Sequence, residues 1–256
     1  MSKTKELDFF VEEKMWGRGF DWYRDQFAGA DDAVAIGEAS PSYTCFPHFG
    51  GVPERIASVM PDVRMIYIVR DPIERMRSAY RHGLSAGIEK RPIGDALLFD
   101  TRYADLGRYA LQLEQFEQHF DRSQILVLTA EDLHDARETT VSRALAFIGV
   151  DASWRPADLG TTLNTAADRP SRPRALWRGL GDFVIKHPRT GRVIAKGLGR
   201  LNGSRLVSRP IADEEMIIDE RLRARLAGAM RPEVERLARW MDPSFDGWGL
   251  LDRRPV

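Results

Sequence analysis

Two short apolar runs stand out in the pattern of hydrophobic and polar positions along the chain. Val63 to Val69 and Ile125 to Leu128 are rich in β-branched residues and almost uninterrupted in apolarity. Such runs are typical of strands that are buried on both faces of a parallel sheet. Val34 to Ile36 predicts a weaker third strand.

Apolar residues recur at helical spacing between and after these strands. Pro53 to Met60 predicts a short helix, with Pro53 suited to its first turn. Three- and four-residue spacing predicts two more helices, carried by Leu106, Tyr109, Leu113, Phe116 and Phe120 and by Val141, Leu145 and Ile148. Gly149 stands at the expected C-cap of the second. Glu214 to Trp248 is helical again, so strands alternating with helices predict an α/β fold with a parallel sheet.

Composition places the chain among ordinary globular proteins. It has 256 residues, 43% of them hydrophobic and 30% charged, and a formal net charge of zero. This balance gives no sign of nucleic-acid binding or of disorder. Cys45 is the single cysteine, so no internal disulfide can form. No apolar run approaches the roughly 20 residues of a membrane span, and MSKTKELDFF has no signal-peptide core, so we expect a cytoplasmic protein.

The region from Arg169 to Arg209 has a different charge balance. It contains eleven Lys or Arg and one acidic residue, Asp182. One interpretation is a solvated pair of amphipathic helices. The other is a basic wall that faces an anionic ligand.

The stretch that follows the first strong strand carries candidate chemistry. Arg70 ends the strand, Asp71 can cap a helix whose first residue is Pro72, and Glu74 falls at the capping-box position. Ligands of open α/β sheets collect at the carboxyl ends of strands. Arg70 there, with Ser78 eight residues on, offers donors suited to a phosphate. The alternative is an arginine paired with a nearby carboxylate and a serine on a solvated face.

These residues resemble a known family. "IVRDPIERMRSAYRH" resembles the 3'-phosphate motif of PAPS-dependent sulfotransferases, and the likeness is closest to the heparan sulfate sulfotransferases and their bacterial relatives. Three further stretches agree in order: "KELDFF" resembles the element that holds the catalytic base, "GEASPSY" the substrate-side element Gly-Glu-Lys-Ser-Pro-x-Tyr, and "LNTAADRPSRP" the late basic loop over the nucleotide. "FDGWGL" is similar to the ending of bacterial members.

The resemblance implies a fold, a reaction and roles for residues. It implies a single domain over residues 1–256 with a P-loop-type parallel sheet flanked by helices. Its reaction would be transfer of a sulfuryl group from PAPS, without a metal, to a hydroxyl or amine of a carbohydrate or small-molecule acceptor. The implied base is Glu6; the implied nucleotide ligands are Arg70, Ser78, Asn164, Arg169 and Arg172; and the implied acceptor-cleft residues are Asp8, Ser40 and Ser42.

Two substitutions depart from the family pattern on the acceptor side. Ala39 stands where glycan-modifying members have Lys, and Asp8 stands where His is frequent. Both changes disfavour a highly anionic glycan acceptor.

A larger departure concerns the donor side. The family's Lys-x-Gly-Thr-Thr loop, whose amides and Lys hold the 5'-phosphosulfate, has no counterpart, because the sequence contains no Lys-x-Gly-Thr-Thr. Met1 therefore resembles an internal methionine, and the missing first strand belongs in the middle of the sheet, between the two strong strands. We expect the exposed strand edges to leave the fold marginal, or to pair with each other or with another chain, as in a homo-oligomer. We also expect residues 1–256 to bind PAPS poorly and to lack activity.

Two alternatives to an active sulfotransferase stay open. A non-catalytic relative would bind a nucleotide or an anionic partner without turnover, and the absent loop favours it. A P-loop kinase that uses ATP would need a Walker lysine and acidic magnesium ligands, and the spacing of Arg70 and Ser78 argues against it.

Overall fold

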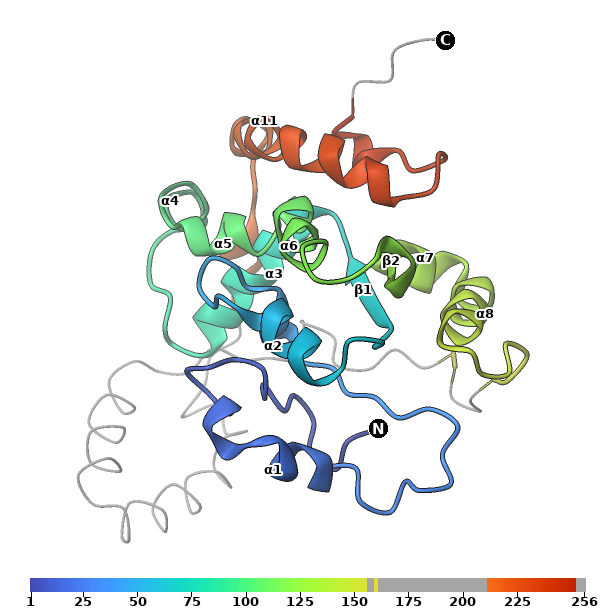
Figure 1. The fold of residues 1–256 in the computed structure, drawn as a ribbon. Coiled ribbons are helices and arrows are strands. Elements are labelled where there is room, and N and C mark those ends of the chain that lie inside the picture. Colours follow the sequence, from blue (N-terminus) through green and yellow to red (C-terminus); the bar gives the residue numbers. More distant parts are fainter. Residues whose placement is uncertain (156–158, 161–210, 252–256) are drawn as a thin grey trace, which may run out of the picture. The chain divides into compact units, whose positions relative to one another are not determined.

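The structure is a computed structural model that describes residues 1–155, 159–160 and 211–251 (Figure 1). The chain forms two compact units, and each is described by itself. Unit 1 comprises Met1–Pro72, Ala104–Leu159 and Ala227–Val256, and unit 2 comprises Ile73–Tyr103 and Gly160–Leu226.

The helices and strands follow one another along the chain in the order α1, α2, β1, α3, α4, α5, α6, β2, α7, α8 and α11. Their bounds are α1 Phe20–Asp25, α2 Val52–Val59, β1 Met65–Val69, α3 Pro72–Ser85, α4 Ile93–Phe99, α5 Thr101–Asp105, α6 Tyr109–Phe116, β2 Ile125–Thr129, α7 Ala130–Asp135, α8 Arg137–Ile148 and α11 Glu220–Leu237. Short 3₁₀ turns are η1 Trp16–Arg18, η2 Pro41–Thr44, η3 Arg122–Gln124, η5 Asp213–Met216, η6 Ala238–Trp240 and η7 Gly247–Gly249. The α/β class predicted from the alternation is confirmed in this coarse sense, with helices between parallel strands.

The sheet of unit 1 consists, within the described residues, of two strands. β1 and β2 pair in parallel, with Met65 opposite Ile125 and Val69 opposite Thr129. Both strong strand predictions are therefore confirmed. The two strands pair directly with each other, which is one of the outcomes expected for their edges.

Two strand predictions were wrong in part or in whole. Ile66 and Ile68 of β1 are 38% and 51% exposed, so β1 is not buried on both faces. Val34 to Ile36 forms no strand, and Val34 is 87% exposed. The run is three residues long and sits between two aspartates and Gly37, so it offers too little apolar area to hold a strand in place.

The helix predictions hold with shifted ends. α2 occupies the predicted segment one residue earlier, and α8 ends at Gly149, whose φ of 80° is the left-handed C-cap that glycine allows. The pattern from Leu106 to Phe120 corresponds to α6 and its flanks rather than to one continuous helix. The helical tail is confirmed by α11 and the 3₁₀ turns after it.

The core of unit 1 is built around the apolar residues of the KELDFF stretch. Phe9 and Phe10 are 0% and 1% exposed, and Phe9 stacks on Tyr23 with the ring centroids 4.6 Å apart. Val69 of β1 and Leu113 of α6 belong to the same core. Burying one such aromatic side chain stabilises the fold by about 1.5–3 kcal/mol, so this stretch is firmly anchored.

Unit 2 contains a network of ion pairs after α3. Arg91 Nη2 lies 2.6 Å from Glu89 Oε2 and 2.7 Å from Asp100 Oδ2, and Arg102 also pairs with Asp100. The buried Tyr103 hydroxyl donates to Glu89 Oε2 at 2.9 Å. Hydrogen bonding to Arg91 lowers the pKa of Glu89 to about 2, and hydrogen bonding to Arg102 holds the pKa of Asp100 below its usual range. The network fixes the loop between α3 and α4.

Across the part of the chain that the structure describes, no helix has both the length and the apolarity needed to cross a membrane.

Candidate functional site

The loop that carries Glu6 has an unusual backbone. Glu6 and Asp8 have φ values of 56° and 51°, in the left-handed region that residues other than glycine seldom adopt. Leu7 between them is 2% exposed, whereas Glu6 is exposed and Asp8 is partly buried. Strained residues of this kind persist where surrounding contacts hold them, and they cluster at functional sites.

The contacts that hold this loop come from the GEASPSY stretch. The backbone N–H of Asp8 donates to Ser40 Oγ, and that of Phe9 donates to Tyr43 Oη, both at 3.0 Å. The two hydroxyls in turn donate to the Glu38 carboxylate, at 2.6 Å from Ser40 and 2.5 Å from Tyr43. Burial, and then the hydrogen bond to Glu38, raises the pKa of Tyr43, so its hydroxyl stays protonated and remains a donor. Glu38 thus holds, through two hydroxyl groups, a loop whose Asp8 lies 32 residues before Ser40.

A lysine completes the cluster. Lys14 Nζ donates to Asp8 Oδ2 and to Ser42 Oγ, both at 2.6 Å, and lies 5.2 Å from the centroid of the Phe49 ring. The other carboxylate oxygen, Asp8 Oδ1, is buried and has no hydrogen-bond partner among the described residues. We call Asp8, Lys14, Glu38, Ser40, Ser42 and Tyr43 the acceptor-side cluster.

The structure brings the three predicted acceptor-cleft residues Asp8, Ser40 and Ser42 together, next to the loop of the predicted base Glu6. Their roles stay predictions. Lys14, Glu38 and Tyr43 were not predicted as site residues from the sequence. Glu38 and Tyr43 lie inside the quoted GEASPSY motif and could have been found there. Lys14 follows the motif KELDFF by several residues and had no signal of its own.

The predicted phosphate-binding stretch has the expected local form. Arg70 is partly buried and follows β1 directly, and α3 begins at Pro72. The backbone N–H of Asp71 donates to Glu131 Oε1 at 3.2 Å, which ties the turn after β1 to the start of α7. A guanidinium partly buried at the carboxyl end of a parallel strand fits the binding of a phosphate.

Of the other predicted nucleotide ligands, the structure describes only Ser78. Ser78 is partly buried on α3, in unit 2, whereas Arg70 belongs to unit 1, so their joint action stays a prediction. Asn164, Arg169, Arg172 and the basic segment 169–209 lie outside the described residues.

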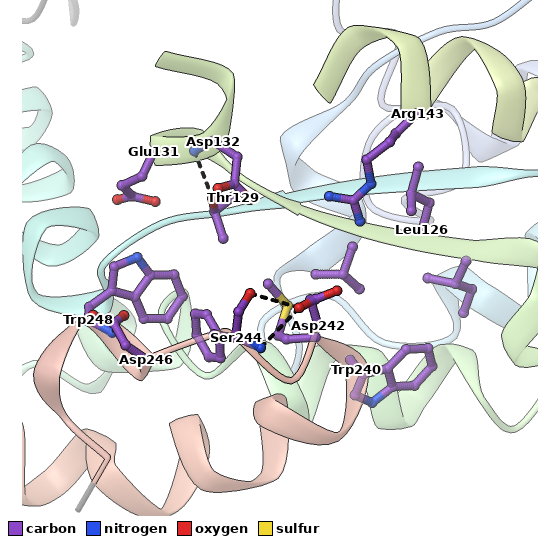
Figure 2. A pocket seen from close by; sticks show the side chains of 14 residues that line it. Leu126, Thr129, Glu131, Asp132, Arg143, Trp240, Asp242, Ser244, Asp246 and Trp248 are labelled. Atoms are coloured by element: carbon purple, nitrogen blue, oxygen red, sulfur yellow. Dashed lines mark hydrogen bonds between the residues drawn. The ribbon is translucent and has the colours of Figure 1, made fainter. Parts of the chain in front are cut away.

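Unit 1 also contains a cavity of about 410 Å³ along β2 (Figure 2). Its walls are the strand itself, the start of α7 and the segment from Trp240 to Trp248. Four carboxylates and one guanidinium line it among the described residues: Glu131, Asp132, Asp242, Asp246 and Arg143. This negative balance is unsuited to a nucleotide with several phosphate charges. Of the described residues predicted for the donor or acceptor, none lines this cavity.

Comparison with known proteins defines the family. The sulfotransferase domain matches residues 4–166, so the chain belongs to the sulfotransferase domain family. The match includes all residues of the acceptor-side cluster and the stretch from Arg70 to Ser78.

Heparan sulfate sulfotransferases are among the similar curated proteins. The chain is 31% identical over 158 residues to human heparan sulfate glucosamine 3-O-sulfotransferase 3B1, a match that covers 57% of this chain and 38% of that protein. It is 30% identical over 214 residues to the mouse 3-O-sulfotransferase 3A1, covering 70% and 52%. It is 26% identical over 166 residues to mouse bifunctional heparan sulfate N-deacetylase/N-sulfotransferase 4, covering 58% and 18%. The chain thus spans only part of the length of these relatives.

A solved structure supports the fold. The crystal structure of a sulfotransferase from Alicyclobacillus acidocaldarius matches with a TM-score of 0.66 and 20% identity, covering 97% of this chain and 87% of that one. The predicted family is confirmed by these findings.

Proposed function

We propose that the protein transfers a sulfuryl group from PAPS to a hydroxyl or amine of a carbohydrate or small-molecule acceptor. Family membership indicates sulfotransferase activity in general. The observation that carries the finer proposal is the hydrogen-bonded junction between KELDFF and GEASPSY, which holds the acidic loop of Glu6 and Asp8 in a left-handed conformation. Such a held, exposed carboxylate is suited to general-base catalysis.

Glu6 is the proposed base. Its exposed carboxylate takes the proton of the acceptor hydroxyl or amine as the acceptor oxygen or nitrogen bonds to sulfur. PAPS would supply the sulfuryl group, and adenosine 3',5'-bisphosphate would leave with the electrons of the broken sulfur–oxygen bond. The proposal involves no metal.

Arg70 and Ser78 are the proposed ligands of the 3'-phosphate. Arg70 offers a forked set of donors at the end of β1, and Ser78 offers a hydroxyl on α3. Asn164, Arg169 and Arg172 are proposed to close over the nucleotide, by resemblance alone. The 256 residues contain no Lys-x-Gly-Thr-Thr loop for the 5'-phosphosulfate, so we expect residues 1–256 alone to lack activity.

The test compares Glu6→Gln with Glu13→Gln in the full-length protein. Glu13 is exposed in the same segment, and its side chain makes no hydrogen bond or ion pair with the described residues, so its variant is a matched control. We expect Glu6→Gln to keep its affinity for adenosine 3',5'-bisphosphate and to lose about 10²–10⁴-fold in turnover with PAPS. Near wild-type turnover would show that another group is the base.

The non-catalytic alternative predicts something different. A protein that binds nucleotide without turnover would show no sulfuryl transfer in the wild type with any acceptor, and the Glu6→Gln change would leave its nucleotide affinity unchanged. The comparisons do not favour this alternative, because the relatives named above are sulfotransferases.

A further inference from the structure

The Lys14–Asp8 pair carries an inference about the acceptor that rests on the proposed function. Lys14 provides a cation on the acceptor side, where Ala39 provides none. This cation is not available as a free charge, because Asp8 Oδ2 lies 2.6 Å from its Nζ. We infer that this pair selects a neutral, hydroxyl-bearing acceptor over an anionic one.

Hydrogen-bond capacity supports the same choice. An ammonium group has three protons. Lys14 donates one to Asp8 and one to Ser42, so the third is left for a ligand. Within the part of the chain that the structure describes, Asp8 Oδ1 has no hydrogen-bond partner. A hydroxyl group can accept from Lys14 and donate to Asp8, so a sugar hydroxyl satisfies both. A sulfate or an ionised carboxyl only accepts, so it would leave Asp8 unsatisfied and be repelled by it.

A ligand can reach this carboxylate. The side chains of Lys14 and Asp8 are 35% and 21% exposed. Oδ1 itself is covered, but the terminal torsion of an aspartate is broad, so rotation of the carboxylate about it can present an oxygen to a bound hydroxyl.

The surrounding charge agrees with this selection. Residues 1–55 contain ten Asp or Glu and six Lys or Arg, so this segment has a net charge of −4. Part of this charge is compensated locally, as in the Arg55–Glu12 pair at 3.3 Å. The remainder disfavours the approach of a polyanion to the acceptor-side cluster, and more strongly at low salt.

The experiment measures selectivity rather than rate. Two oligosaccharides with the same backbone serve as acceptors, one neutral and one carrying sulfate and carboxylate groups. The full-length wild type, Asp8→Asn and Lys14→Met are assayed with PAPS, and Asp31→Asn is the matched control. Asp31 is exposed in the same acidic segment and its side chain has no hydrogen bond or ion pair with the described residues. Asn accepts a left-handed backbone well, so Asp8→Asn should keep the loop folded.

The expected result is a shift in the ratio of the two kcat/KM values. The wild type should favour the neutral acceptor by about tenfold or more. Asp8→Asn, which leaves Lys14 with an unpaired charge, should move the ratio about tenfold toward the anionic acceptor, with a KM for it that rises with salt. Lys14→Met should move the ratio the other way, and Asp31→Asn should leave it unchanged.

Contrary outcomes separate this inference from the proposed function. A wild type that prefers the anionic acceptor, or an Asp8→Asn variant whose two rates fall together at constant ratio, overturns the inference while sulfuryl transfer stands. Absence of transfer to either acceptor overturns the proposed function. In that case saturation-transfer NMR measures the binding of each oligosaccharide to residues 1–256. Equal or stronger binding of the anionic oligosaccharide refutes the inference.

Discussion

Glu38→Gln tests whether the Ser40 and Tyr43 hydroxyls, which donate to Glu38 and accept from the backbone of Asp8 and Phe9, hold the loop of Glu6. Glu38 accepts hydrogen bonds from Ser40 at 2.6 Å and from Tyr43 at 2.5 Å. A glutamine at this position keeps one oxygen as an acceptor but loses the charge and turns an amide toward the second hydroxyl. The variant therefore weakens one bond and misdirects the other, while the size of the side chain is unchanged.

The magnitude follows from the kind of bond lost. A hydrogen bond to a charged group contributes about 1.5–3 kcal/mol, and partial exposure of Glu38 favours the lower half of this range. A loss of about 2 kcal/mol should lower Tm by about 4–8 °C in a domain of this size. Turnover should fall further than stability alone explains, because the hydroxyls of Ser40 and Tyr43 orient the backbone beside the proposed base.

The assay is a double-mutant cycle on the free energy of unfolding. Glu38→Gln, Tyr43→Phe and the double variant are unfolded in urea, with Glu13→Gln as the surface control, whose change should stay within about 0.5 kcal/mol. Because Glu38 and Tyr43 share one hydrogen bond, the cost of the double variant should be about 0.5–3 kcal/mol smaller than the two single costs added together. If the costs of the two single variants add up to the cost of the double variant, Glu38 and Tyr43 stabilise the fold independently and the shared hydrogen bond contributes nothing.

Two further predictions concern the donor side and unit 2. In the full-length protein, Arg70→Ala should weaken the binding of adenosine 3',5'-bisphosphate about tenfold or more, because a charge-assisted bidentate pair is lost. Arg24→Ala on the surface is the control and should leave this affinity unchanged. Equal affinities of wild type and Arg70→Ala in calorimetry would contradict the proposed role. The pKa of Glu89, about 2 in the folded protein against an ordinary 4.5, means that its ion pairs stabilise the fold above about pH 4.5 and lose this effect as the pH falls toward 2. Thermal unfolding at pH 7, 4.5 and 3 should show a smaller drop in Tm for Glu89→Gln than for the wild type, and equal drops would show that Glu89 does not contribute.

The local parts of the fold could be predicted from the sequence because their signals are local. Arg70 follows a β-branched run, Pro72 starts a helix, and Gly149 supplies the left-handed end of another. The exposure of Ile68 could not be predicted in this way, because an apolar run gives the strand but not what covers each face.

The candidate site residues likewise fall into those with a local sequence signal and one without. The motif likeness predicted Asp8, Ser40 and Ser42, and the structure brings them together because the two motifs share backbone-to-hydroxyl bonds. Lys14 was missed because a lone lysine in an acidic stretch has no periodicity or motif. Its position depends on the turn after Val11, which brings Nζ back to Asp8.

The KELDFF stretch restricts how the proposed acceptor site can change during evolution. The same few residues present an exposed carboxylate and bury two phenylalanine rings at 0% and 1% exposure. An insertion or deletion here would shift the rings out of register with the core. We therefore expect natural variants to keep the length of this loop. Side chains can still be exchanged in place. A descendant of this chain would acquire a new acceptor through single substitutions at positions such as Asp8, Lys14 and Ala39, on a backbone that does not move.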